Sequence, residues 1–390
     1  MIPNRNAYLS EARRIVVKVG SNVLTAESGL NLYAVRNISR QICRLIDQGK
    51  ELLLVTSGAM AAGISKVGLS RRPDRVPQRQ AVSAVGQAGL IMEYEHAFDR
   101  YGIKVAQVLM TSDGINNRRR YLNARNTLNT LLGWGIVPII NENDTVAVES
   151  IQFGDNDTLA ATISLLMDAD LLINLTDIDG LFDKDPRIHA DARLIPQVDS
   201  ITAKIKTLAG GLPGALGTGG MSTKIKAARR VMSAGIPMII ANGAKGDTLI
   251  RIFQGAELGT FFLPKAHKLA SRKSWIGFSV KPEGLLKIDS GAARAIRDGG
   301  KSLLPSGITA VEGDFPAGVP VALCTIEGRQ LATGLVNYRA GDIRKIMGRH
   351  SRAIAQTLGD NPYDEVVHRD NLVITEEDAE SAPNPGEASP

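Results

Sequence analysis

The sequence of 390 residues contains only two cysteines, few aromatic residues and no long hydrophobic run. Cys43 and Cys324 are isolated from each other and form no CxxC pair, which excludes a disulfide framework and a zinc ribbon. The longest apolar candidate, residues 160–175, is interrupted by Asp168 and Asp170 and falls short of the ~18 residues that a membrane helix needs. Because the N-terminus also carries charges where a signal peptide would be apolar, we expect a cytoplasmic protein without a membrane segment.

The charge balance is only mildly basic. Lys and Arg total 46 against 40 Asp and Glu, a net charge of +6. This excess is too small to argue for nucleic-acid binding by itself, although it suits an anionic substrate. The length predicts two or three domains, large enough to bury a core without disulfides or metal ions.

Between residues 14 and 263, short aliphatic runs alternate with longer segments of helical periodicity. The runs are nearly continuous in Val, Ile and Leu, which is typical of strands buried on both faces of a parallel sheet. Alternation of strand and helix predicts an α/β fold, an α/β/α sandwich with a mainly parallel sheet. The predicted strands are residues 15–19, 52–56, 105–109, 136–140, 171–175 and 238–241.

The composition changes after residue 264, where a basic polar stretch precedes a segment rich in Gly and Pro turns. That segment predicts a small β-rich domain with one short helix near residues 292–297. The last residues are rich in Glu, Ala, Ser and Pro without apolar periodicity, which predicts disorder from about residue 375. We therefore divide the chain into an N-terminal extension (1–13), an α/β domain (14–264), a linker (265–282), a β-rich domain (283–360) and a tail (361–390).

Polar residues and glycines follow most of the predicted strands. In an open parallel sheet, ligands bind beyond the carboxyl ends of the strands. Glycines and small hydroxyl residues expose backbone N–H groups to phosphate, lysines add positive charge, and aspartates can hold a hard cation or an ammonium group. These ends predict a site for phosphates, magnesium and a small zwitterion. They comprise residues 18–22, 56–59, 141–144, 154–157, 176–177 and the glycine-rich segment 210–224.

No single member of this set is decisive. The sequence contains no GxxxxGK[ST] loop, since Lys224 follows the hydroxyl residues, and no GxGxxG follows the first strand. Lys18 alone fits a solvated charge, Ser57 alone fits a helix N-cap, and residues 210–220 alone fit a surface loop. The functional interpretation depends on the repetition of the pattern at successive strand ends.

Eight motifs occur in a fixed order along the first 264 residues. They are IVVKVGS (15–21), VTSGA (55–59), AVGQ (84–87), YLNAR (121–125), INEND (140–144), GDND (154–157), LTD (175–177) and GTGGMSTK (217–224). Their sequence and order resemble the glutamate 5-kinase family of the amino acid kinase superfamily, and relatives such as aspartokinase lack INEND and GDND. Residues 284–348 resemble a PUA domain.

This resemblance implies ATP-dependent phosphorylation of the L-glutamate side-chain carboxylate to L-glutamyl 5-phosphate, the first step of proline biosynthesis, with Mg²⁺ carried by ATP. It implies proline as a feedback inhibitor, and we expect a homo-oligomer, either dimer or tetramer. By the same resemblance Lys18, Lys224 and Asp157 are catalytic, and Ser57, Asp144 and Asn156 bind glutamate. The implied nucleotide site contains Lys18, Thr176, Asp177, Thr218, Gly219, Gly220, Met221, Ser222, Thr223 and Lys224.

Two alternatives stay open. The enzyme could be another amino acid kinase, acting on acetylglutamate, aspartate or a nucleoside monophosphate. The PUA-like domain could instead bind RNA through a basic patch of Lys287, Arg294, Arg297 and Lys301. A solvated helix face explains that patch equally well, and RNA binding is not favoured because no aromatic stacking platform accompanies the charges.

Overall fold

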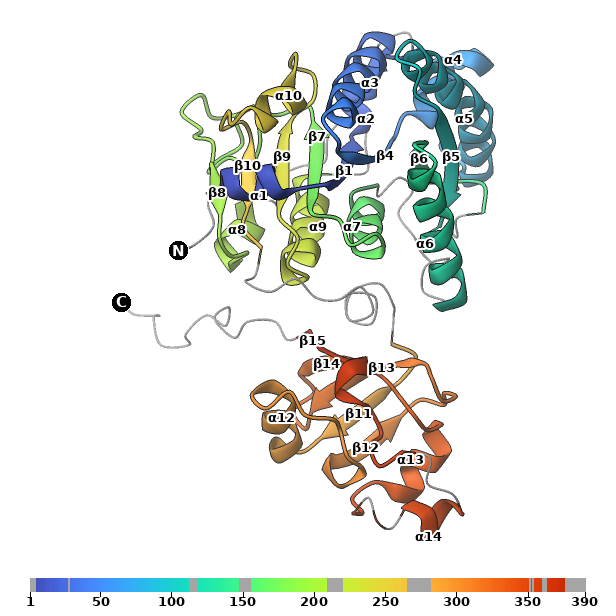
Figure 1. The fold of residues 1–390 in the computed structure, drawn as a ribbon, viewed down its shortest axis with the longest axis vertical. Coiled ribbons are helices and arrows are strands. Elements are labelled where there is room, and N and C mark those ends of the chain that lie inside the picture. Colours follow the sequence, from blue (N-terminus) through green and yellow to red (C-terminus); the bar gives the residue numbers. More distant parts are fainter. Residues whose placement is uncertain are drawn as a thin grey trace. The chain divides into compact units, whose positions relative to one another are not determined.

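A computed structural model describes residues 5–26, 29–111, 118–146, 156–208, 220–264, 282–350, 352, 354–359 and 363–375. The chain forms two compact units, Met1–Lys268 and Leu269–Pro390. The first contains a large, mostly parallel sheet between helices, and the second contains a smaller sheet (Figure 1). No helix among these residues is long and apolar enough to span a membrane.

The first unit is organised around an eight-stranded sheet with the order β5-β6-β4-β1-β7-β9-β10-β8. The predicted strands are confirmed, and they pair in parallel. Their carboxyl ends therefore meet at one edge of the sheet, as the site prediction requires. They are β1 (Arg14–Val19), β4 (Glu51–Val55), β5 (Val105–Met110), β6 (Val137–Glu142), β7 (Leu171–Thr176) and β9 (Met238–Asn242).

Three strands at the margins of this sheet differ from the expectation. Among the described residues, strand β5 lies at the edge of the sheet beside β6 and is only half-buried, so the prediction of burial on both faces is wrong for this strand. Two short strands were not predicted. They are β10 (Thr260–Phe262), antiparallel to β9, and β8 (Gln197–Val198), parallel to β10.

Helices cover both faces of the sheet (Figure 1). One face carries α3 (Leu32–Asp47), α4 (Ala59–Val67), α5 (Val76–Asp99) and α10 (Thr248–Phe253). The other carries α6 (Arg118–Gly133), α7 (Asn156–Leu166) and α9 (Met221–Ser233). This is the predicted α/β/α sandwich.

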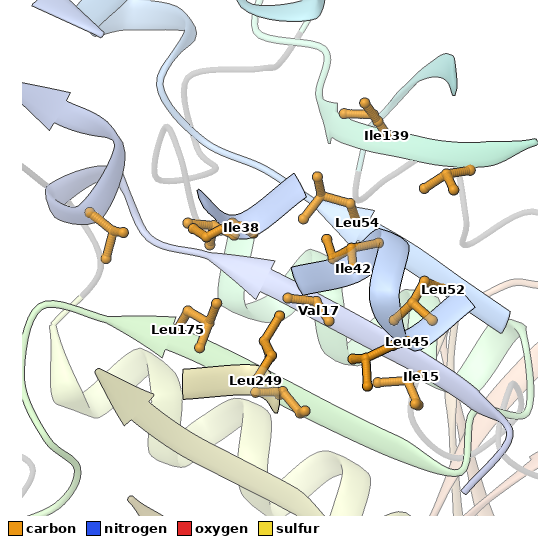
Figure 2. Packing of buried hydrophobic residues seen from close by; sticks show 14 of the residues in the cluster. Ile15, Val17, Ile38, Ile42, Leu45, Leu52, Leu54, Ile139, Leu175 and Leu249 are labelled. Atoms are coloured by element: carbon orange, nitrogen blue, oxygen red, sulfur yellow. The ribbon is translucent and has the colours of Figure 1, made fainter. Parts of the chain in front are cut away.

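The packing of α3 shows how the sequence builds the first of these layers. Asn31 caps the helix, with its Oδ1 accepting a hydrogen bond from the N–H of Ala34 at 3.1 Å. One turn apart, Ile38 and Ile42 lie in the same hydrophobic cluster as Val17 of β1 (Figure 2). All three are fully buried. This packing fixes β1, and with it the position of the residues that follow that strand.

The predicted N-terminal extension packs against the core of the first unit. Residues Arg5–Glu11 form helix α1, and Leu9 and Ala12 belong to the same hydrophobic core as β1. Arg5 donates a hydrogen bond to the carbonyl of Leu258 at 2.5 Å.

Helices α4 and α5 cross at a contact that only glycine permits. A Cβ atom on Gly86 would lie 1.9 Å from the carbonyl oxygen of Ala59, the first residue of α4. We expect Gly86→Ala to lower the free energy of unfolding by about 1–3 kcal/mol, because the two backbones must move apart. Chemical denaturation measures this.

Gly89 provides the matched control on the same helix, because a Cβ atom there would meet nothing within 4 Å. Gly89→Ala should stabilise the protein slightly through the helix propensity of alanine. Equal stability of the two variants would contradict the close-contact explanation.

The second unit contains a five-stranded sheet with the order β12-β11-β13-β14-β15. The predicted short helix is α12 (Ser290–Arg297). The strands are β11 (Leu285–Ile288), β12 (Ile308–Glu312), β13 (Pro320–Thr325), β14 (Gln330–Leu335) and β15 (Leu372–Ile374).

Residues beyond 360, the predicted end of the β-rich domain, also pack into the second unit. Strand β15 pairs with β14, and Val366 and Val367 are fully buried in the core of this unit. Residues 376–390 of the predicted disordered tail, and residues 265–281 of the predicted linker, lie outside the described part of the chain.

Candidate active site

Asp157 is the centre of the site at the carboxyl edge of the sheet. It lies in the first turn of α7, and its side chain is 1% exposed. Its Oδ1 accepts hydrogen bonds from Lys18 Nζ at 2.5 Å and Asn174 Nδ2 at 2.8 Å. Its Oδ2 accepts from Thr223 Oγ1 at 2.5 Å and lies 3.2 Å from Lys224 Nζ. One carboxylate thus joins residues from β1, β7, α7 and α9.

The electrostatics of this cluster keep Asp157 ionised. Burial alone would raise the pKa of Asp157, but the charges of Lys18 and Lys224 outweigh it and hold the pKa well below the ordinary value. Both lysines are themselves buried, at 4% and 5% exposure. The interpretation of Lys18 as a solvated charge is therefore wrong, and Asp157 holds two ammonium groups at the strand ends.

Asn156, the residue before Asp157, connects the cluster to β4 and β6. Its Nδ2 lies 2.8 Å from the carbonyl oxygen of Thr56, 3.0 Å from Ser57 Oγ and 3.1 Å from Asn141 Oδ1. Its Oδ1 is buried and has no hydrogen-bond partner among the described residues. A buried acceptor without a partner is uncommon in folded proteins, which makes this oxygen a candidate to receive a hydrogen bond from a ligand.

Ser57 and Asp144 lie at the ends of neighbouring strands. Ser57 contacts Asn156 as described, and no cap hydrogen bond from a side chain is present at the start of α4. Asp144 follows β6. Burial raises the pKa of Asp144 above its ordinary value, while the hydroxyl of Ser83 and the charge of Arg72 oppose this shift.

Two asparagines organise these contacts, of which the sequence analysis included Asn141 among the strand ends but missed Asn174. Asn174 lies within β7 and is 1% exposed, and Asn141 in β6 donates from Nδ2 to Gln87 Oε1 of α5 at 2.8 Å. A usable signal was present for Asn174, because it is a polar residue inside an otherwise aliphatic run. Polar residues buried within a strand need partners, and here the partner is the central carboxylate.

A pocket next to Lys224 is lined by both apolar and polar residues. Ile178, Leu181 and Phe182 are among the apolar ones, and Gly220 and Lys224 are among the others. Apolar side chains suit a nucleotide base, and a lysine beside a glycine backbone suits phosphate.

The predicted nucleotide-binding residues distribute unevenly around this pocket. Thr176, Asp177, Gly220, Met221 and Lys224 line it. Ser222 is exposed, and the Thr223 hydroxyl is used by Asp157 and by the carbonyl oxygen of Gly220 at 2.8 Å. Thr218 and Gly219 lie outside the described residues, as does Asp155.

The predicted basic patch of the second unit is partly neutralised. Lys287 of β11 forms an ion pair with Glu312 of β12 at 3.0 Å. Arg294 and Arg297 lie in the last turn of α12, where cations favour the helix dipole.

Comparison with known proteins agrees with the geometry. Residues 13–242 match the amino acid kinase family. The protein named glutamate 5-kinase of Syntrophus aciditrophicus is 48% identical over 374 residues, which cover 96% of this chain and 97% of that protein. The protein of the same name in Caldanaerobacter subterraneus is 51% identical over 364 residues, covering 93% and 98%. The chain belongs to the glutamate 5-kinases of the amino acid kinase family.

Membership of this family confirms the resemblance noted in the sequence. Residues 284–358 also match the PUA domain, in agreement with the small β-rich second unit. The crystal structure of a UMP kinase from Bacillus anthracis aligns with a TM-score of 0.47 at 16% identity, covering 66% of this chain and 99% of that one.

Proposed function

We propose that this protein transfers the γ-phosphoryl group of ATP to the side-chain carboxylate of L-glutamate, producing L-glutamyl 5-phosphate for proline biosynthesis. The observation that carries the proposal is the buried Asp157 with its two lysines, placed between Asn156 on one side and the pocket of Gly220 and Lys224 on the other. The high identity to proteins named glutamate 5-kinase supports the choice of substrate.

The chemistry requires charge stabilisation more than proton transfer. A glutamate side chain has a pKa of about 4.3, so the nucleophile is already ionised at neutral pH and needs no general base. The barrier is the approach of an anion to ATP and the charge that spreads over the γ-phosphoryl oxygens. Lys18 and Lys224, preorganised by Asp157 in a buried site, are suited to lower it.

The substrate side of the site is proposed to consist of Ser57, Asn156 and Asp144. The unpaired Oδ1 of Asn156 suits a hydrogen bond from the glutamate ammonium group. Asp144 supplies the carboxylate that pairs with this ammonium. The nucleotide side consists of Lys18, Thr176, Asp177 and residues 218–224.

Mg²⁺ is proposed to bind with the ATP phosphates and to neutralise their charge. The Asp177 carboxylate lines the nucleotide pocket and offers oxygen atoms, which are the ligands that Mg²⁺ prefers. Hydrogen bonds from Asn22 and Thr176 outweigh the effect of burial and lower the pKa of Asp177, so it is ionised at neutral pH. Proline inhibition and a homo-oligomeric state stay predictions.

The proposal is tested by a substrate panel with purified protein. ADP release should occur with ATP and L-glutamate, and hydroxylamine should trap the acyl phosphate as a hydroxamate. Acetylglutamate, aspartate and UMP are the comparison substrates. Turnover of any of these at a higher kcat/KM than glutamate would reject the proposed substrate.

Asp144→Ala should raise the KM for glutamate far more than the KM for ATP. Losing one partner of a buried charged pair typically costs about 2–5 kcal/mol, which corresponds to a rise of at least ~30-fold. Steady-state kinetics with each substrate varied in turn measure the split.

Asp144→Asn is the companion variant, because it keeps the shape of the side chain and removes its charge. It should show most of the same effect. An unchanged glutamate KM in both variants would place Asp144 outside the substrate site.

A further inference from the structure

Asn22 lines the pocket proposed for the nucleotide, and it belongs to the strand-end segment 18–22, but no role of its own has been assigned to it. It belongs to the short helix α2 (Ser21–Leu24), which follows β1 after Gly20, and it lines the pocket together with Asp177 and Lys224. Its Nδ2 donates a hydrogen bond to Asp177 Oδ2 at 2.9 Å. This bond joins the segment after β1 to the end of β7.

Through this hydrogen bond, both oxygens of the Asp177 carboxylate accept a hydrogen bond from a side chain. The other oxygen, Oδ1, accepts a hydrogen bond from Thr176 Oγ1 at 3.0 Å. With a donor on each oxygen, the plane of the carboxylate is fixed. Without Asn22, Oδ2 loses its donor and the carboxylate can rotate about its side-chain bonds.

Rotation matters because Lys224 lines the same pocket. Asp177 and Lys224 attract each other electrostatically, in addition to the 3.2 Å contact of Lys224 with Asp157. A loosened Asp177 would compete with Asp157, and with phosphate, for this ammonium group. Asn22 thus keeps the Asp177 carboxylate from pairing with Lys224, whose ammonium group the nucleotide phosphates need.

The second polar atom of Asn22 points to the same conclusion. Its Oδ1 is buried and has no hydrogen-bond partner within the described residues. The NH₂ group and the carbonyl oxygen of an amide lie in one plane, so the bond to Asp177 also fixes the direction of Oδ1. Buried amides without a ligand-related role usually satisfy both ends within the protein.

We infer that Asn22 is a positioning residue of the nucleotide site, which holds Asp177 in the orientation that ATP binding requires. This inference rests on the proposed function only in taking ATP as the nucleotide.

The inference is tested with Asn22→Asp and Asn22→Ala in the full-length protein. Aspartate has the same shape, lacks the donor and places a second negative charge against Asp177. We expect the KM for ATP to rise by about tenfold or more in Asn22→Asp and less in Asn22→Ala, with the glutamate KM changed less than about threefold. Calorimetric titration with ATP in the absence of glutamate should show a parallel rise in Kd.

Asn31→Ala is the matched control, because Asn31 caps α3 and does not line the pocket. It should lower the Tm without changing the Kd for ATP. Wild-type ATP affinity in Asn22→Asp overturns the inference. So does a lowered Tm with an unchanged ATP-induced Tm increase, which would indicate a purely structural role.

The two proposals fail in different ways. ATP titration requires no turnover, so it measures the effect of Asn22 whatever the acceptor substrate is. If the wild-type protein bound ATP but did not phosphorylate glutamate, the proposed function would fail while the inference on Asn22 would still be decided by the titration.

Discussion

Asp157→Asn is expected to lower both the stability of the protein and its turnover. The substitution leaves Lys18 and Lys224, each about 95% buried, without a counter-charge. Removing one member of a buried ion pair costs about 3–5 kcal/mol of unfolding free energy. Since both ammonium groups also lose the carboxylate that orients them, kcat should fall by at least ~10²-fold. Urea denaturation and steady-state kinetics measure the two effects.

The pH dependence of the unfolding free energy shows whether Asp157→Asn acts by removing the charge of Asp157 or by disturbing the packing around it. Because the pKa of Asp157 is lowered in the folded protein, its stabilising contribution is complete above the unfolded pKa of about 3.9 and is lost as the pH falls through the folded value. The stability difference between wild type and Asp157→Asn should therefore be constant from about pH 5 to 8 and shrink below about pH 4.

Asp170→Ala serves as the control for this prediction. Asp170 precedes β7, at the opposite end of the sheet, and accepts hydrogen bonds from the backbone N–H groups of Arg13 and Arg14. Its loss should reduce stability with little change in kcat. Normal stability and turnover in Asp157→Asn would remove Asp157 from the centre of the site.

The central strands were predictable because each of them is a continuous aliphatic run, and burial on two faces demands such a run. A continuous aliphatic run does not mark a strand that is very short, or a strand that pairs with a partner far away in the sequence. Strand β8 has only two residues, and β15 joins the second sheet through a long-range pairing of Ile374 with Ala332. The short aliphatic runs at residues 366–367 and 372–374 are separated by charged residues, and nothing local in them marks a pairing with a strand about 40 residues earlier.

The strand ends predicted where the charged residues of the candidate site lie. They did not predict which residues form hydrogen bonds with them. Lys18, Asp157 and Lys224 come together as the parallel topology requires. The hydrogen bond of Asn174 to Asp157 depends on how β7 and α7 pack, which no motif records. The same holds for Asn22: the strand-end pattern includes residues 18–22, but the hydrogen bond of Asn22 to Asp177 is visible only in the structure.

Lys224→Ala should lower kcat by at least ~10²-fold while changing both KM values much less. Lys224 follows Gly220 within the first turn of α9 and lines the pocket proposed for the nucleotide, so in the proposed site its ammonium group would meet phosphate rather than the glutamate backbone. Charge on the γ-phosphoryl oxygens shifts during transfer, and a lysine placed there stabilises the transition state more than the bound substrates. The fold should persist, because Asp157 retains Lys18 at 2.5 Å.

Two further variants make this prediction specific. Lys224→Arg should recover little activity, because a planar guanidinium group does not replace a compact ammonium group in a buried site. Lys226→Ala is the matched control: it removes the same charge from an exposed position two residues along α9 and should leave kcat within about twofold. If Lys224→Ala instead kept nearly normal kcat and weakened only ATP binding, Lys224 would be a ground-state phosphate anchor. The transition-state role would then belong to Lys18 alone, and Asp157 would serve mainly to position that residue.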